Sequence, residues 1–159
     1  MITQALAVLF DGIIYSSWLF IIAVGLTLIY GVMKILNIAH GSLYALGAYT
    51  AAYLSGIWIN LGYTPFFTFV IMILSAIIVG ITFGFIIEQG LLRFMYGKDE
   101  IVLVLVTYAV FLILEDFIKI VWGVNPYFLY QPYSILGSFN ISDLTYPNYN
   151  ILLFVIAIL

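Results

Sequence analysis

The sequence predicts an all-α fold, a polytopic bundle of transmembrane helices with four spans and the start of a fifth. Of its 159 residues, 66% are hydrophobic and only 7% are charged, whereas soluble domains are about 25% charged. Four basic and seven acidic side chains are too few to keep a globule of this size dispersed in water. Several uncharged stretches reach the roughly 20 residues that a helix needs to cross a bilayer. Because they lack the two-residue alternation of barrel strands, helices are expected.

The scarce charges bound the first three spans. Residues 12–33 carry no charge and form the first predicted span. The next charge after Lys34 is Glu88, so the stretch between them is too long for one crossing and must fold back once. Turn formers and interfacial aromatics at 58–65 mark the turn. The second span is therefore expected at 42–57 and the third at 65–87.

The second half of the chain holds one complete span and part of another. The polar stretch 88–100 precedes a fourth predicted span at 101–122. Residues 123–150 are rich in proline, tyrosine, asparagine and serine, which predicts a structured external loop at the membrane interface. The apolar residues 151–159 are too few to cross a bilayer and are interpreted as the start of a fifth span. The chain is thus predicted to be a single, incomplete transmembrane domain, truncated from a longer protein.

Basic residues predict the orientation, because short loops rich in Lys and Arg stay in the cytoplasm. Arg93 and Lys98 share the stretch 88–100, which is therefore expected to be cytoplasmic. Counting back two spans places Lys34 on the same side and the amino terminus outside. The expected localisation is the cell (inner) membrane, as a multi-pass protein.

Small residues predict close helix packing in the second and third spans. On the second span they recur at steps of three and four residues, which places them on one face where another helix can approach. A single GxxxG pair on the third span is a weaker signal of the same kind. Packing is the favoured interpretation, and lining a substrate path is the alternative for a central helix. The predicted packing residues are Gly41, Ala45, Ala48, Ala52, Ser55, Gly80 and Gly84.

Residues 30–41, between the first two spans, combine an amide, an imidazole and two glycines. Irregular backbone is tolerated at membrane depth only inside protein or along a water-filled cavity, where its polar groups can face a solute. One interpretation makes Asn37 and His40 gate or path residues. The other, slightly favoured, makes them structural: Asn37 or Ser42 caps the next helix, and His40 bonds a neighbouring carbonyl.

Glu115 and Asp116 lie inside the fourth predicted span, where ionisable residues are costly and usually face a cavity or a partner. One interpretation assigns them to a proton or cation path. A local pair with Lys119 explains them at least as well, since it follows four and three residues later. Adjacent carboxylates point about 100° apart on a helix, so they cannot work as an acid and base on one substrate atom.

Motifs of enzymes and nucleic-acid-binding proteins are missing from the sequence. The chain has one histidine and no cysteine, and it lacks a glycine-rich phosphate loop, an HExxH pair and a nucleophile elbow. The net charge of −3 comes without a basic patch. We therefore expect no catalytic residue, no metal or cofactor and no nucleic-acid partner. An intramembrane enzyme using His40 with Glu115 would require the two side chains to converge.

A dense run of motif residues covers positions 25–49. It reads GLTLIYG at residues 25–31 and then N-x-AHG-x-x-Y-x-LGAY at residues 37–49. Downstream, Glu88, Arg93 and the LILED of residues 112–116 continue the pattern. This pattern resembles the branched-chain amino-acid ABC transporter permeases, the Liv-type inner-membrane family, and the resemblance covers most of the chain.

The resemblance implies a permease subunit of an ABC importer, which is a transport protein and not an enzyme. It implies branched-chain, hydrophobic amino acids as substrates, an external amino-acid-binding protein that delivers them, a second permease subunit and separate cytoplasmic ATPase subunits. The alternative function is a small self-associating membrane channel or scaffold that oligomerises through its small residues. The candidate path or gating residues are Asn37, His40, Gly41, Tyr44, Glu115 and Asp116.

Overall fold

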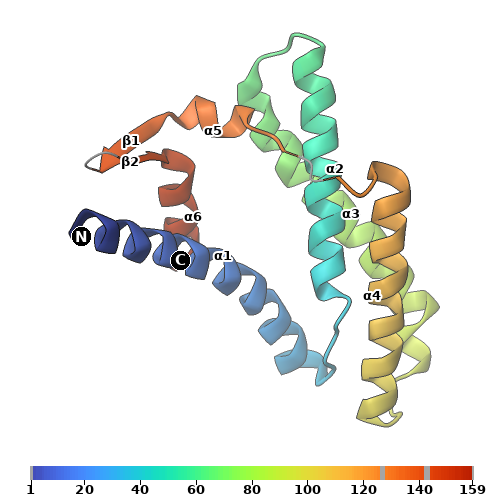
Figure 1. The fold of residues 1–159 in the computed structure, drawn as a ribbon. Coiled ribbons are helices and arrows are strands. Elements are labelled where there is room, and N and C mark those ends of the chain that lie inside the picture. Colours follow the sequence, from blue (N-terminus) through green and yellow to red (C-terminus); the bar gives the residue numbers. More distant parts are fainter. Residues whose placement is uncertain (1, 126–127, 142–143, 159) are drawn as a thin grey trace. The chain divides into compact units, whose positions relative to one another are not determined.

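The computed structural model describes residues 2–125, 128–141 and 144–158. The chain divides into two compact units, one of Leu26–Leu129 and one that combines Met1–Gly25 with Tyr130–Leu159. Helix α1 (Ile2–Met33) contributes residues to both (Figure 1). Apart from one two-stranded sheet, the regular elements of the described residues are helices, which confirms the predicted all-α class.

Helix α1 is longer than the span predicted at 12–33, because it begins at Ile2. The prediction started after Asp11, but one carboxylate does not end a helix whose neighbours are all apolar, and Asp11 lies inside α1. At a rise of about 1.5 Å per residue, a helix of 32 residues is about 48 Å long. This length exceeds the roughly 30 Å hydrocarbon core of a bilayer, so α1 has turns to spare beyond one crossing.

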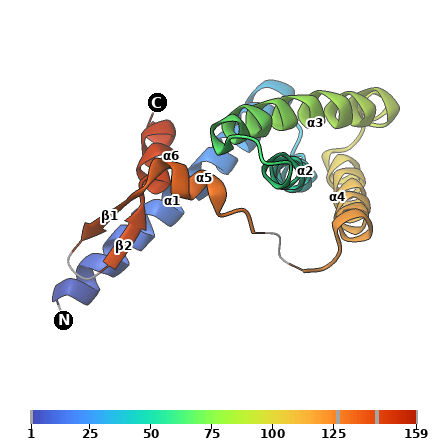
Figure 2. The ribbon, with the colours of Figure 1, turned by 90° about the horizontal axis from the view of Figure 1, so that it is seen from above.

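The larger unit is built on three helices, α2 (His40–Asn60), α3 (Thr68–Gly90) and α4 (Glu100–Trp122). Two short 3₁₀ turns, η1 (Pro65–Phe67) and η2 (Leu92–Phe94), flank α3. Helix α2 packs against both α3 and α4 and lies between them (Figure 2). The second helix is therefore the central one of this unit, as its content of small residues suggested.

The predicted turn at 58–65 is present and is held by local contacts. Helix α2 ends at Asn60, and Gly62 adopts a φ of 81°, a left-handed conformation that L side chains avoid. The indole of Trp58 stacks on Tyr63 with 4.4 Å between ring centroids and donates a hydrogen bond to the Thr64 carbonyl at 3.1 Å. Pro65 then starts η1 with its fixed φ and no amide proton to satisfy.

The buried core of the larger unit lies where α2 meets its two neighbours. Ala39, just before α2, and Leu46 within it belong to this core. The side chain of Asp99 caps α4 by accepting from the Ile101 amide at 2.9 Å. Outside this core the helices expose large aliphatic side chains, which suits a lipid surrounding rather than water. The buried cluster consists of Ala39, Leu46, Val79, Ile87, Leu92, Val110, Leu114 and Ile118.

The buried face of α2 differs from the predicted small-residue stripe. Its buried residues are Ser42, Leu46, Gly47, Ala51 and Ser55. The stripe lies beside them: of its members on α2 only Ser55 is buried, Ala45 and Ala52 are half-buried, and Gly41 and Ala48 are exposed. Gly80 is exposed, and neither it nor Gly84 has a neighbouring atom where a side chain would begin. Small residues recur on adjacent faces of α2, so spacing alone could not select the packed one.

Among the described residues, three helical stretches are long and apolar enough to cross a membrane: Gln4–Met33, Pro65–Phe94 and Glu100–Trp122. They correspond to the first, third and fourth predicted spans, and they make the chain a multi-pass membrane protein. Helix α2, with 21 residues, is long enough but is not among them, because its glycine, serine, threonine and tyrosine residues lower its mean hydropathy. The crossing predicted at 42–57 therefore stays a prediction.

The smaller unit joins the first part of α1 to the last segment of the chain. Helix α5 (Gln131–Leu136), strands β1 (Ser138–Ile141) and β2 (Leu144–Pro147) and helix α6 (Asn148–Ile158) follow one another. The strands pair antiparallel with Phe139 opposite Tyr146. Phe10 of α1 lies 6.2 Å from the Phe139 ring and 5.5 Å from the Tyr146 ring, between centroids. The predicted loop 123–150 thus holds a hairpin packed on α1, and α6 begins ahead of the fifth span predicted at 151.

Candidate functional site

The candidate site is the break between α1 and α2, residues 34–39, which the sequence singled out for its polar groups. Helix α1 ends at Met33, and Lys34 directly after it adopts a φ of 55° while its amide donates to the Tyr30 carbonyl at 2.9 Å. This left-handed residue turns the chain out of the helix. The next five residues are not helical, yet Ile35, Asn37 and Ala39 among them are buried. Much of the break is therefore packed inside the protein, which is the condition that irregular backbone within a membrane must meet.

Asn37 organises the turn that starts α2. Its side-chain Oδ1 accepts from the Ala39 amide at 3.1 Å, and its own carbonyl accepts from the His40 amide at 3.2 Å. This is the turn that asparagine side chains commonly form with the backbone two residues on. The contacts fit the structural interpretation of Asn37, while its predicted role in a substrate path stays a prediction.

Thr107 of α4 holds the break, and sequence reasoning did not find it. The side chain is fully buried. Its Oγ1 accepts from the Ile38 amide at 3.3 Å, and its hydroxyl has the Leu36 carbonyl at 3.3 Å and the Val104 carbonyl at 3.1 Å as acceptors. A lone threonine in an apolar helix gives no warning of this role, because only the fold brings residues 36 and 107 together.

The first turn of α2 is tied to α4 by a second hydroxyl. Ser42 donates to the Phe111 carbonyl at 3.3 Å, one turn beyond Thr107 on α4. Of the other predicted path residues on this turn, His40 is half-buried, whereas Gly41 and Tyr44 are exposed. The structure thus brings Asn37, His40, Gly41 and Tyr44 together at one place, the amino end of α2.

Glu115 and Asp116 form a separate cluster with Lys119. The Lys119 Nζ lies 2.7 Å from Glu115 Oε1 and 3.7 Å from Asp116 Oδ1. These distances fit the local pair that the spacing suggested. Glu115 follows Thr107 by eight residues, which is about 12 Å along the helix axis. Within the described part of the chain no contact joins Glu115 to His40, so the convergence that an enzyme using both would require is not seen.

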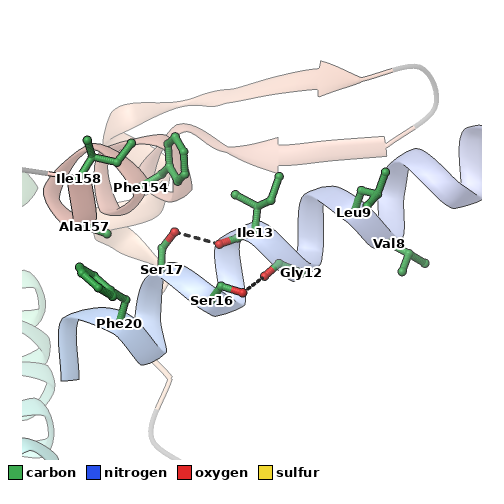
Figure 3. Close-up of a pocket in the computed structure, with 10 residues that line it drawn as sticks. All are labelled: Val8, Leu9, Gly12, Ile13, Ser16, Ser17, Phe20, Phe154, Ala157 and Ile158. Carbon is green, nitrogen blue, oxygen red and sulfur yellow. Dashed lines mark hydrogen bonds between the residues drawn. The ribbon is translucent and has the colours of Figure 1, made fainter. Parts of the chain in front are cut away.

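Apolar grooves flank the helices of both units. In the smaller unit, a groove of about 570 Å³ lies between α1 and α6 (Figure 3). Ser16 and Ser17 line it, but their hydroxyls donate to the Gly12 and Ile13 carbonyls of their own helix, at 2.7 and 2.9 Å. The remaining lining residues are Val8, Leu9, Phe20, Phe154, Ala157 and Ile158. A zwitterionic solute would find no charged partner among these residues.

The groove of the larger unit is also apolar. It measures about 380 Å³, lies between α3 and α4, and is lined by residues that include Phe83, Gly90 and Phe117. Neither groove offers a polar group comparable to those of the break. The break between α1 and α2 is therefore better suited to a polar solute than either of these two grooves.

Outside the spanning helices, the stretch 88–100 carries a tyrosine–carboxylate contact. The Tyr96 hydroxyl donates to Glu88 Oε1. Burial, with the hydrogen bond and the charge of Glu88, raises the pKa of Tyr96 to about 12. Arg93 Nη1 donates to Gln89 Oε1 at 3.1 Å. These contacts tie the loop back onto the end of α3.

Comparison with known proteins agrees with the motif. A family model described as "Branched-chain amino acid transport system / permease component" matches residues 8–159. The high-affinity branched-chain amino acid transport system permease protein LivH of Salmonella typhimurium is 24% identical over 116 residues, and that of Escherichia coli K12 is 23% identical over the same length. Each match covers 72% of this chain but only 38% of the relative. No solved structure gives a significant match.

Proposed function

The chain belongs to the permease component family of branched-chain amino acid transport systems, and we propose that it is a membrane-spanning permease subunit of an ABC importer. Its substrates are branched-chain, hydrophobic amino acids, which an external binding protein delivers. A second permease subunit completes the path, and cytoplasmic ATPase subunits drive the transport. Substrate and partners are proposals for the whole importer, because the matches cover 38% of the relatives.

The buried break between α1 and α2 carries the proposal. Spanning helices offer a polar solute only side chains, since their backbone groups bond one another. A break releases backbone amides and carbonyls at membrane depth, where they can face the ammonium and carboxylate groups of an amino acid. Asn37 belongs to this break, His40 starts α2 directly after it, and the exposed Gly41 and Tyr44 follow. We assign the path or gating role to these four residues.

We assign Glu115 and Asp116 a secondary role in the same permease, either along the polar path or in contact with a partner chain. Their two carboxylates face one ammonium, that of Lys119, so the cluster keeps a net negative charge near the end of α4. Such a charge suits a polar path or a partner chain better than lipid. Exchanging Asp116 for Asn tests this, and reduced uptake at an unchanged amount of protein is expected.

Uptake and purification together test the function. Deleting the gene is expected to reduce uptake of radiolabelled leucine, isoleucine and valine, and re-expression of the full-length gene restores it. Uptake of an unrelated acidic amino acid serves as the control. The tagged protein is also expected to co-purify with an ATPase subunit. If deletion leaves uptake unchanged and no ATPase subunit co-purifies, the importer assignment is wrong. Homo-oligomers found by crosslinking would then favour a self-associating channel or scaffold.

A further inference from the structure

We infer that Thr107 is a positioning residue of the permease. From α4 it acts as a latch, meaning that its hydrogen bonds hold the break in the conformation in which Asn37 and His40 can serve the proposed path. The inference rests on the proposed function and deepens it, because it names a residue outside the motif that sets the geometry of the path segment. It is carried by hydrogen bonds within the larger unit.

One oxygen atom holds the peptide groups on both sides of Asn37. The Leu36 carbonyl belongs to the peptide before Asn37 and the Ile38 amide to the peptide after it, and both lie 3.3 Å from Thr107 Oγ1. Fixing two successive peptide planes fixes the φ and ψ angles of the residue between them. Thr107 therefore sets the backbone conformation of Asn37 without touching its side chain.

The position of Thr107 on α4 explains why a hydroxyl is needed there. It follows Glu100, the charged first residue of the helix, by seven residues, or about 10 Å along the axis. At that depth water is scarce, and an unpaired backbone group is costly. Leu103 and Val110, the neighbouring buried residues of α4, offer no polar atom. Thr107 is the side chain of this face that can pair with the break.

On the side of α4, the hydroxyl can release the break without leaving an unsatisfied donor. A threonine hydroxyl carries one proton, and Thr107 has two acceptors for it, the Leu36 carbonyl at 3.3 Å and the Val104 carbonyl of its own helix at 3.1 Å. When the break moves away, the proton stays bonded to Val104, so α4 keeps no unsatisfied donor. The bonds to the break lie at the long end of the usual range. Thr107 thus holds the segment through bonds whose loss leaves α4 itself satisfied and unpairs only the backbone groups of the break.

A labelling experiment tests the latch directly. The chain has no cysteine, so Ala39→Cys creates a single thiol at a fully buried position of the break. Membranes containing the full-length protein are treated with a water-soluble maleimide, and the rate of labelling is measured. Adding Thr107→Val, which keeps the side-chain shape and removes the hydroxyl, is expected to raise the rate about five- to tenfold, as loss of such bonds implies. Thr107→Ser is expected to restore slow labelling.

Thr50→Val is the matched control. The Thr50 hydroxyl donates to the Leu46 carbonyl of its own helix at 2.8 Å, so the same chemical change there leaves the break untouched. Ser42→Ala, which removes the neighbouring tie to Phe111, is a second test variant in case Thr107→Val does not accumulate. It is expected to raise the labelling rate in the same direction.

Uptake separates a positioning role from a merely structural one. In proteins without the added cysteine, Thr107→Val is expected to lower the maximal rate of leucine uptake several-fold per molecule in the membrane, with Thr107→Ser close to wild type. Equal labelling of wild type and Thr107→Val would overturn the latch. Faster labelling with unchanged uptake would overturn its positioning role. The labelling needs neither substrate nor ATPase, so a wild type that transports no branched-chain amino acid would refute the proposed function without refuting the latch.

Discussion

Single polar side chains decide the geometry of the break, and Asn37 is the first of them. Its amide oxygen accepts from the amide of Ala39, a residue with no exposed surface. A buried amide without an acceptor costs the protein more than a lost surface bond, because no water replaces the partner.

Replacing Asn37 by alanine is expected to destabilise the protein by about 1–2 kcal/mol, because the Ala39 amide loses its acceptor. Asn37→Ser is expected to cost less, since serine forms the same kind of turn more weakly. Thermal unfolding in detergent measures both. If alanine and serine were equally tolerated, the side chain of Asn37 would have no capping role, and a role in the path alone would explain its place in the motif.

The contact between Tyr96 and Glu88 gives a prediction about ionisation. Exchanging Glu88 for Gln removes the negative charge and weakens the acceptor, so the pKa of Tyr96 is expected to fall from about 12 towards its ordinary value of 10.0. Because the folded pKa is raised, this contact favours folding below pH 10 and loses its effect as the pH rises through 12. The ultraviolet absorbance of phenolate, measured against Tyr96→Phe, reports the change. An unchanged pKa would mean that burial alone raises it.

At the scale of the elements, the contact between α2 and α3 depends on a small residue at Gly47. A side-chain β-carbon built at Gly47 would lie 4.0 Å from the Ala76 backbone, which is an ordinary contact distance. A methyl group fits there, whereas a longer side chain would extend beyond this point at a buried position beside α3. By contrast, no atom lies within 4 Å of the corresponding point at Gly80.

Gly47→Ala is therefore expected to be tolerated, and Gly47→Leu to force α2 and α3 apart and destabilise the protein by about 1–3 kcal/mol. Gly80→Leu is the matched control and is expected to leave unfolding in detergent unchanged. If Gly80→Leu instead prevents assembly with a partner chain, the packing role predicted for Gly80 and Gly84 belongs to that interface. Equal destabilisation by both leucine variants would contradict the observed packing.

At the scale of the whole molecule, the orientation in the membrane is the property that the basic residues predict. Single cysteines report it without background, since the chain has none. In intact cells, a membrane-impermeant thiol reagent added outside is expected to label Ser138→Cys, in the hairpin of the predicted outer loop, and to spare Lys98→Cys. Opening the cells should make both accessible. The reverse pattern would invert the topology and place the amino terminus in the cytoplasm.

Much of the architecture was predictable, because in a membrane protein the long uncharged, apolar stretches of the sequence mark the helices that can cross the bilayer. The end of α3 and the start of α4 follow from the charged stretch 88–100 between them, and the turn at 58–65 follows from its glycine and proline. Helix α1 begins at Ile2, ahead of the span predicted at 12–33, since a lone Asp11 does not end a helix. The hairpin at 138–147 was missed, because its strands are short. Its Phe139 and Tyr146 rings pack on Phe10 of α1, and no local pattern records a contact between segments so distant in sequence.

The sequence by itself determined the membrane class and the family, because composition and contiguous motifs are local properties of the chain. The tertiary structure alone decided which face of α2 is buried and which residue holds the break. Thr107 lies 71 residues from Leu36 in sequence, and its hydroxyl is indistinguishable from any other threonine until the helices pack. Hydrogen bonds between distant segments depend on that packing, and no local pattern records them.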